Sequence, residues 1–221
     1  MKTSALKYTF AAPVVVGADP VDGLLQTTDL DRPVPVNIEV WNGVEPGYFM
    51  QLKLNGELVG DIYTFNESDI PSDFVTLTLS EKLLDHDGVY DLAFSATGHH
   101  SLVTIDSPSI YFKVDRSTPG AALLSPIIFP EVTLGDNLAG QIPSYAGMQE
   151  GDLIQTVCNG VPGPVHSVVA DELSHQPVNI IFERSFLQDL GRETVLIEYF
   201  VTDRAGNISI MSLPVYLTLQ V

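Results

Sequence analysis

The chain has 221 residues, 45% of them hydrophobic, and carries 28 acidic against 10 basic residues, for a formal net charge of −18. This apolar content excludes a disordered chain, and the length allows two ordinary globular cores. The negative charge excludes recruitment by nucleic acid or by anionic membranes, and no apolar run reaches the roughly 20 residues needed for membrane insertion. The single cysteine, Cys158, excludes an intramolecular disulfide and leaves the cellular compartment open.

The N-terminus contains no Sec signal peptide that we can identify. Two lysines precede residues 8–17, but this stretch is short for an apolar h-region and contains Pro13. We expect residues 1–8 to form a loose tail. A location at the bacterial cell surface or outside the cell would therefore need another export route or a longer parent protein, and a cytoplasmic location stays open.

Alternating hydrophobicity predicts strands along most of the chain. Val34, Val36, Ile38 and Val40 alternate with polar residues or proline, which is the period of a strand with one buried face. The same period recurs at 76–80, 92–96 and 195–199. Short segments at 81–85 and 185–190 could each hold one helical turn. Short strands separated by Asn-Gly and Asp-Gly turns predict an all-β sandwich or barrel.

Tyr90 favours the sandwich. It follows Gly88 by two residues and precedes Leu92 by two, which is the position of the tyrosine corner in immunoglobulin-like domains. We therefore predict that its hydroxyl group bonds to a backbone group just upstream. In the second half of the chain, Glu193 is expected at the matching place, so the corner is predicted only in the first half.

The chain repeats itself. Residues 38–56 match residues 142–160 at a constant offset, since 142 − 38 gives 104. The identical pairs are Ile38/Ile142, Gly43/Gly147, Gly47/Gly151, Gln51/Gln155, Asn55/Asn159 and Gly56/Gly160. Later segments match at offsets of 103 and 105, as loops of different length would produce. We predict two tandem domains, 1–117 and 118–221, and the short linker containing Pro119 and Gly120 favours an elongated arrangement.

Residues 199–209, with the sequence YFVTDRAGNIS, resemble the Y-x-V-T-D-x-A-G-N-x-S signature of bacterial Ig-like repeats. Residues 142–152 are similar to a recurrent stretch of such repeats in large bacterial surface proteins. In the first half, residues 96–101 stand where the turn of the signature would lie. The resemblance implies two tandem immunoglobulin-like β-sandwich domains, and it implies no catalytic activity.

Candidate chemistry is sparse. Cys158 aligns with Leu54, so we expect it in a core rather than as a nucleophile, and adjacent His99 and His100 should point to opposite faces of a strand. No cofactor is expected apart from calcium, for which loop oxygens are suitable ligands, although solvated loop charge explains the same residues. The calcium candidates are Asp29, Asp31, Asp85, Asp87, Asp203 and Asn207.

Two functions fit the sequence. The first is a non-catalytic tandem module that acts as a spacer or in adhesion at a bacterial surface, as a monomer or within a longer repeat array. The second is a small accessory protein that binds a carbohydrate or a protein partner, such as a toxin or phage-tail component. The two halves differ most at one loop, so the candidate binding residues are Thr97, His99, His100 and Arg204. The aromatic candidates for a sugar site are Trp41, Tyr48, Tyr63 and Tyr145, of which Trp41 and Tyr145 align as a repeated pair.

Overall fold

The computed structural model describes residues 10–218 except 71, 132–134, 175–176 and 192. The chain divides into two compact units, Met1–Asp115 and Arg116–Val221, and each unit has its own hydrophobic core. The tail predicted at residues 1–8 lies outside the described residues. None of the helices in the described part of the chain has the length and apolarity that a membrane span requires.

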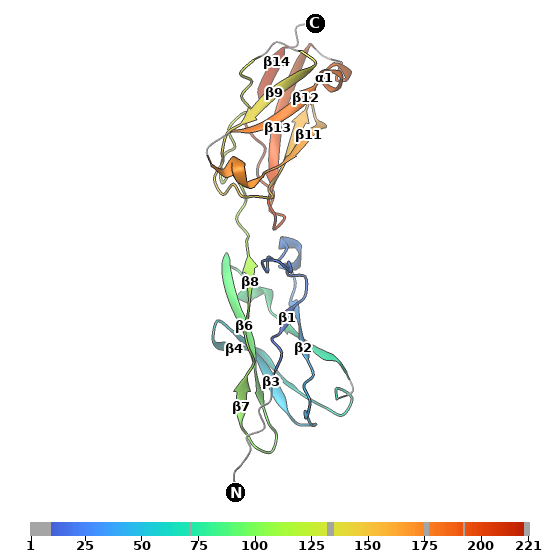
Figure 1. The fold of residues 1–221 in the computed structure, drawn as a ribbon, viewed down its shortest axis with the longest axis vertical. Coiled ribbons are helices and arrows are strands. Elements are labelled where there is room, and N and C mark those ends of the chain that lie inside the picture. The colour runs from blue at the N-terminus through green and yellow to red at the C-terminus, as the bar shows by residue number, and fades with distance from the viewer. Residues whose placement is uncertain (1–9, 71, 132–134, 175–176, 192, 219–221) are drawn as a thin grey trace. The chain divides into compact units, whose positions relative to one another are not determined.

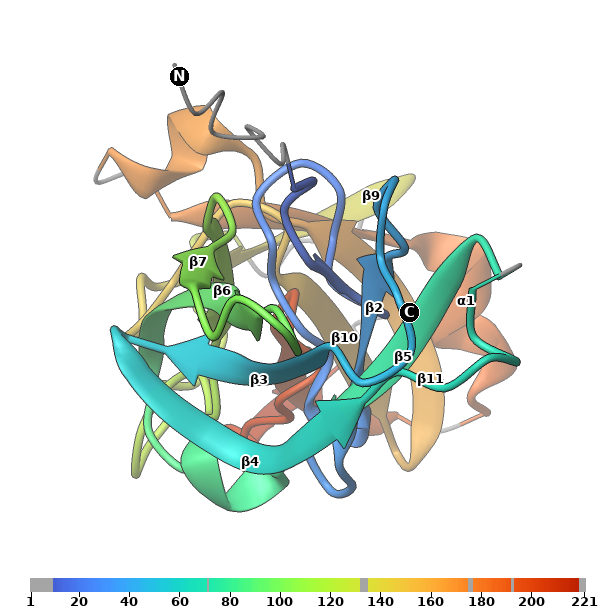
Figure 2. The same cartoon turned by 90° about the horizontal axis from the view of Figure 1, so that it is seen from below.

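The first unit is a sandwich of two antiparallel sheets (Figure 1). One sheet has the order β1-β2-β5, with β1 at Val14–Val15, β2 at Val34–Glu39 and β5 at Phe74–Leu79. The other has the order β4-β3-β6-β7, with β8 also paired to β6. Its strands are β3 (Phe49–Leu54), β4 (Glu57–Thr64), β6 (Gly88–Thr97), β7 (Thr104–Asp106) and β8 (Ile110–Val114). Figure 2 shows β3 and β4 as neighbours, joined by a tight hairpin.

The second unit repeats this plan. One sheet pairs β9 (Asn137–Ile142) with β12 (Val178–Glu183). The other has the order β11-β10-β13-β14, formed by β10 (Leu153–Cys158), β11 (Val161–Ser167), β13 (Thr194–Thr202) and β14 (Val215–Thr218). The short helices are η1 (Thr27–Asp29), η2 (Glu81–Leu83), η3 (Ala170–Leu173) and α1 (Arg184–Asp189). The predicted all-β, immunoglobulin-like sandwich fold is confirmed, and helical turns form in both segments where the sequence allowed them.

The hairpin turn at the end of β3 recurs at the end of β10. Asn55 and Asn159 both have a φ of 51°, and each is followed by a glycine with positive φ, as type I′ hairpins require. The Asn55 Oδ1 accepts a hydrogen bond from the Asp91 backbone N–H at 2.9 Å, and the Asn159 Oδ1 accepts one from Leu196 N–H at 2.9 Å. The asparagine side chain therefore joins the hairpin to the adjacent strand, β6 or β13, in both units.

The repeated glutamine supports a bulge in the same hairpins. The pairing of β3 with β4 shifts register between Met50 and Leu52, and that of β10 with β11 shifts between Gln155 and Val157, one residue further along the repeat. The Gln51 Nε2 donates to the carbonyl oxygen of Gly60 at 2.8 Å, and the Gln155 Nε2 donates to that of Gly163 at 2.9 Å. Each glutamine thus satisfies a carbonyl group that the irregular ladder leaves without a strand partner.

A repeated serine supports the last strand. The backbone N–H of Phe94 donates to Ser107 Oγ at 3.0 Å, and that of Tyr199 donates to Ser212 Oγ at 3.0 Å. Both pairs are 13 residues apart, and both bonds are buried. Residues that the two halves share in sequence or in position therefore act within the fold.

The tyrosine corner is confirmed in the first unit, because the Tyr90 hydroxyl donates to the carbonyl oxygen of His86 at 2.8 Å. The prediction that Glu193 matches Tyr90 in the second unit was wrong. Leu54 pairs with Leu92, and its counterpart Cys158 pairs with Ile197. Strand β6 therefore matches β13 at an offset of 105. The counterpart of Tyr90 is therefore the buried Val195 (90 + 105 = 195) and not Glu193, since residues inserted before β13 shift the alignment.

Replacing Tyr90 by phenylalanine should lower the free energy of unfolding of the first unit by about 1 kcal/mol, because one partly buried hydrogen bond is lost. Trp41 is the only tryptophan and lies in the core of this unit, so its fluorescence during urea titration reports this transition. Tyr111→Phe is the control, since Tyr111 is 69% exposed and should tolerate the change. Equal losses for the two variants would contradict the role of the corner.

Candidate functional site

The predicted binding loops lie over the repeated glycines of each unit. A Cβ atom on Gly47 would come within 2.9 Å of the His99 Cγ, and one on Gly151 would come within 2.7 Å of the Arg204 Cδ. Both glycines also have a φ near +90°, which disfavours other residues. His99 and Arg204 thus occupy equivalent positions. Each packs directly on a glycine, and neither glycine has room for a side chain.

His99 and His100 differ from the sequence prediction in geometry. They lie in a turn and not on a strand, so their rings are in contact, with centroids 4.8 Å apart at an angle of 60°. Both are exposed, whereas Thr97 is buried, with its Oγ1 2.8 Å from the Thr104 Oγ1. Of the four predicted loop residues, Thr97 therefore holds strands together, and the two histidines are accessible to a partner.

The loop between β6 and β7 also contains two residues that the sequence did not single out. Leu102 is 73% exposed and Val103 is 56% exposed at its tip. Leu102 has a φ of 53°, a conformation that is strained for a bulky residue. The Leu102 N–H bonds to Gly98 O at 2.9 Å, and the Gly98 N–H bonds to Val103 O at 3.1 Å, so the turn is closed by its own backbone. The loop presents an ordered apolar tip.

The predicted calcium ligands do not converge. The Asp29 Oδ1 is 2.8 Å from the Arg32 guanidinium, and Asp85 contacts the neighbouring His86 ring. Asp31 and Asp87 are exposed. Within the residues that the structure describes, no three His, Cys, Asp or Glu side chains form a group that could hold a metal ion.

Asp203 and Asn207 close the turn of the signature segment. The Asp203 carboxylate accepts hydrogen bonds at 2.8 Å from both the backbone N–H and the side-chain Nδ2 of Asn207. The Asp203 N–H in turn donates to Asn207 O at 3.0 Å. These bonds give Asp203 and Asn207 a structural role that needs no bound ion. Calcium binding stays a prediction.

Asp203→Ala should destabilise the second unit by about 1–2 kcal/mol, because the Asn207 donors lose their acceptor. Calorimetry in calcium and in EDTA separates this effect from ion binding. Asp203→Asn is the matched control, since it keeps an acceptor oxygen but removes the charge. If calcium binds here, it should raise the melting temperature of the native protein and not that of Asp203→Asn. The same unfolding temperature in calcium and EDTA would contradict the calcium prediction.

Cys158 lies in the core of the second unit and is 0% exposed. Burial raises the pKa of its thiol to about 11, so the thiolate that a nucleophile requires does not form at neutral pH. Its counterpart Leu54 is also buried, at 6% exposure. The cysteine fills an apolar position of the repeat.

His166 and Glu172 form a partly buried acid–base pair, with the Nε2 and Oε2 atoms 2.9 Å apart. The same carboxylate oxygen accepts the Val169 N–H at 3.0 Å at the start of η3. Burial opposes ionisation of Glu172, but the bonds from His166 and Val169 outweigh it and lower the pKa of the carboxyl group. The pair fastens η3 to β11.

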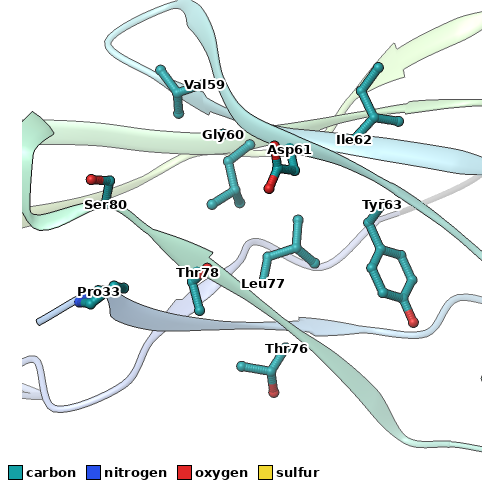
Figure 3. Close-up of a pocket in the computed structure, with 11 residues that line it drawn as sticks. Pro33, Val59, Gly60, Asp61, Ile62, Tyr63, Thr76, Leu77, Thr78 and Ser80 are labelled. Atoms are coloured by element: carbon teal, nitrogen blue, oxygen red, sulfur yellow. The ribbon is translucent and has the colours of Figure 1, made fainter.

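A groove of about 340 Å³ runs between β4 and β5 in the first unit (Figure 3). Leu77 points from β5 toward β4, while Asp61 is the only charged residue among the residues that line the groove. A second hollow, of about 630 Å³, lies beside α1 in the second unit and is lined by Asn159, Val161, Phe186, Asp189, Leu190 and Leu196. Neither hollow brings together a set of polar side chains that suggests a reaction.

The aromatic candidates for sugar binding are mostly structural. Trp41 is buried and packs against Phe10 and Phe65, with ring centroids 4.8 and 5.2 Å away. The Tyr145 hydroxyl donates to the buried Asp152 Oδ2 at 2.7 Å. No row of exposed aromatic rings forms among these residues.

No protein-family model matches the chain, and a search of curated proteins also gives no match. Among solved structures, the chain is similar to one of a 1.5-MDa bacterial ice-binding adhesin, studied for host cell surface retention. That match has a TM-score of 0.48 and 15% identity over 90% of this chain, which spans 60% of the length of the adhesin structure.

Two further solved structures are similar to the chain. One comprises the chicken CNTN1 FN1–FN3 domains, with a TM-score of 0.40, 11% identity, and coverage of 96% of this chain and 68% of that one. The other is a tetra-tandem repeat in the extending region of a large adhesion protein, with a TM-score of 0.35, 14% identity, and coverage of 95% and 49%. The likeness to these tandem-domain structures is one of fold.

Proposed function

We propose that this chain is a non-catalytic pair of immunoglobulin-like modules that acts as a spacer or adhesion segment of a bacterial surface protein. The observation that carries the proposal is the role of the repeated residues. Asn55 and Asn159 fasten a hairpin, Gln51 and Gln155 satisfy a bulge, and each pair acts in the same way in both units. Residues that recur with the same structural role in both units belong to a scaffold rather than to a reactive site.

The titratable groups support the same proposal. The Cys158 thiol is buried, and the Glu172 carboxylate serves a helix start as well as His166. An enzyme would need a nucleophile or an acid–base group that faces a hollow large enough for a substrate. The groove between β4 and β5 is lined by the Asp61 carboxylate and by the hydroxyl-bearing residues Tyr63, Thr76, Thr78 and Ser80, and its lining contains no histidine, lysine or second carboxylate to complete an acid–base pair.

The surface location can be tested on intact cells that produce the protein. Protease added outside the cells should remove the protein, as judged by an antibody to the first unit, while a cytoplasmic marker stays intact. Lysed cells provide the control for cleavability. Protection in intact cells together with cleavage after lysis would exclude a surface role.

A second function, binding of a protein partner, is favoured by one observation. The β6–β7 loop holds Leu102 exposed and in a strained conformation, while His99 and His100 lie beside it. Strain of this kind is kept where it serves a site. The carbohydrate version has less support because Trp41 and Tyr145 are committed to the fold.

Leu102→Asn should abolish capture of such a partner without loss of stability, because asparagine removes the apolar tip and tolerates positive φ better than leucine. The measurement is a pull-down from the surface fraction of host or neighbouring cells, with a glycan array in parallel. Val21→Asn is the matched control, since Val21 is 91% exposed and lies in another loop of the same unit. Equal capture by both variants and the native chain would contradict a role of this loop.

A further inference from the structure

The outer face of the larger sheet in the second unit carries a group of exposed apolar side chains, which lie among the polar residues Gln155, Thr194, Glu198 and Thr202. Strands β10 and β13 alternate strictly, so that Ile154, Thr156 and Cys158 face the core while the residues between them face outward. The exposed fractions on the outside are 44% for Leu153, 51% for Val165, 59% for Ile208 and 71% for Tyr216. Leu196 and Phe200 are half-buried on the same side.

The strand register places these side chains in adjoining rows. Tyr216 pairs with Leu196 across β14 and β13. Phe200 pairs with Gln155, which pairs with Val165 on β11. Thr202 pairs with both Ile208 and Leu153. The outward residues therefore form one continuous surface, which we call the outer face.

The first unit keeps the same sheet with a more polar outer face, on which Tyr111, Val89 and Leu58 are nevertheless exposed at 69%, 61% and 57%. Its residues Asp91, Ser95 and Asp106 occupy the positions of Leu196, Phe200 and Met211, each at an offset of 105. Lys53 likewise occupies the position of Val157, at an offset of 104.

These polar groups bond to one another. The Lys53 Nζ is 2.6 Å from the Asp106 Oδ2, and the Ser95 hydroxyl donates to the other Asp106 oxygen. Because the bonds stabilise the ionised carboxylate, the pKa of Asp106 is lowered. The fold thus accepts polar groups at these positions, so the apolar side chains there in the second unit are no requirement of folding.

We propose that the outer face of the second unit binds the same face of a second copy of this chain. Two twisted sheets pack well face to face, in the way that the inner faces of a sandwich do. Of the outward residues on β10 and β13, only Glu198 carries a charge. In a chain with a net charge of −18, this is a surface on which two copies can approach with little local repulsion.

The area of the outer face sets the size of the contact. Four strands and four rows of alternate residues cover about 500 Å². A two-fold dimer would then bury about 1,000 Å², which is the lower end for a specific interface and corresponds to weak, reversible association. The proposal does not depend on the surface role, because it concerns the chain in solution.

The experiment uses the full chain and a matched pair of tyrosines. Sedimentation equilibrium should detect a dimer as protein concentration rises from about 10 μM to about 1 mM, the range for an interface of this size. Tyr216→Ser and Phe200→Ser should each weaken the dimer, and both together should raise its dissociation constant at least tenfold. Tyr111→Ser is the control, because Tyr111 pairs with Asp91 as Tyr216 pairs with Leu196 and is 69% exposed.

Circular dichroism establishes that the variants are folded, and NMR spectra on dilution locate the contact. Shifts confined to the outward residues of β10, β13 and β14 support the proposal. A native chain that remains monomeric at about 1 mM overturns it, since a face of this area should then associate measurably. A loss of association in Tyr111→Ser equal to that in Tyr216→Ser also overturns it, because the contact would then lie elsewhere.

Discussion

The register between β3 and β6, and between β10 and β13, is the constraint on which the rest of each unit depends. Side chains alternate along a strand, so a slip by one residue would turn every apolar side chain from the core to solvent. Asn55 and Asn159 oppose such a slip, because each joins a tight turn to the backbone of the neighbouring strand by a side-chain hydrogen bond. The positive φ of both residues suits this arrangement, because asparagine adopts the left-handed conformation more readily than most residues other than glycine.

With this register fixed, the other repeated residues correct local irregularities. Gln51 and Gln155 satisfy a carbonyl group where one strand has extra residues, and Ser107 and Ser212 accept an N–H group where the last strand departs from β6 or β13. Each device leaves the inner face of the sheet unchanged. The outer faces and the loops are therefore free to differ between the units, and it is there that the chemistry diverges.

The predictable part of this protein rested on periodicity and on internal repetition. Val34, Val36 and Ile38 are buried as their alternation predicts, and Tyr90 forms the corner that its spacing indicates. The assignment of Glu193 as its counterpart failed, because the sequence does not show where residues are inserted before β13. The pairing of β13 with β10 does show it. The contact between the His99 and His100 rings was missed because strand geometry was applied to the directions of two side chains that lie in a turn.

The sequence by itself determined the all-β class, the tandem duplication of one unit and the core positions of the alternating strands. Apolar alternation and turn residues act locally and recur along the chain. Only the tertiary structure decided the rest. It showed that Asp203 is bonded to Asn207, that His99 and Arg204 lie on equivalent glycines, and that the outer face of the second unit has apolar residues where the first unit has a bonded polar cluster. The Asp203–Asn207 bonds depend on the conformation of one turn, while the contacts on the glycines and the outer face join segments that are distant in sequence, so apolar alternation alone predicted none of them.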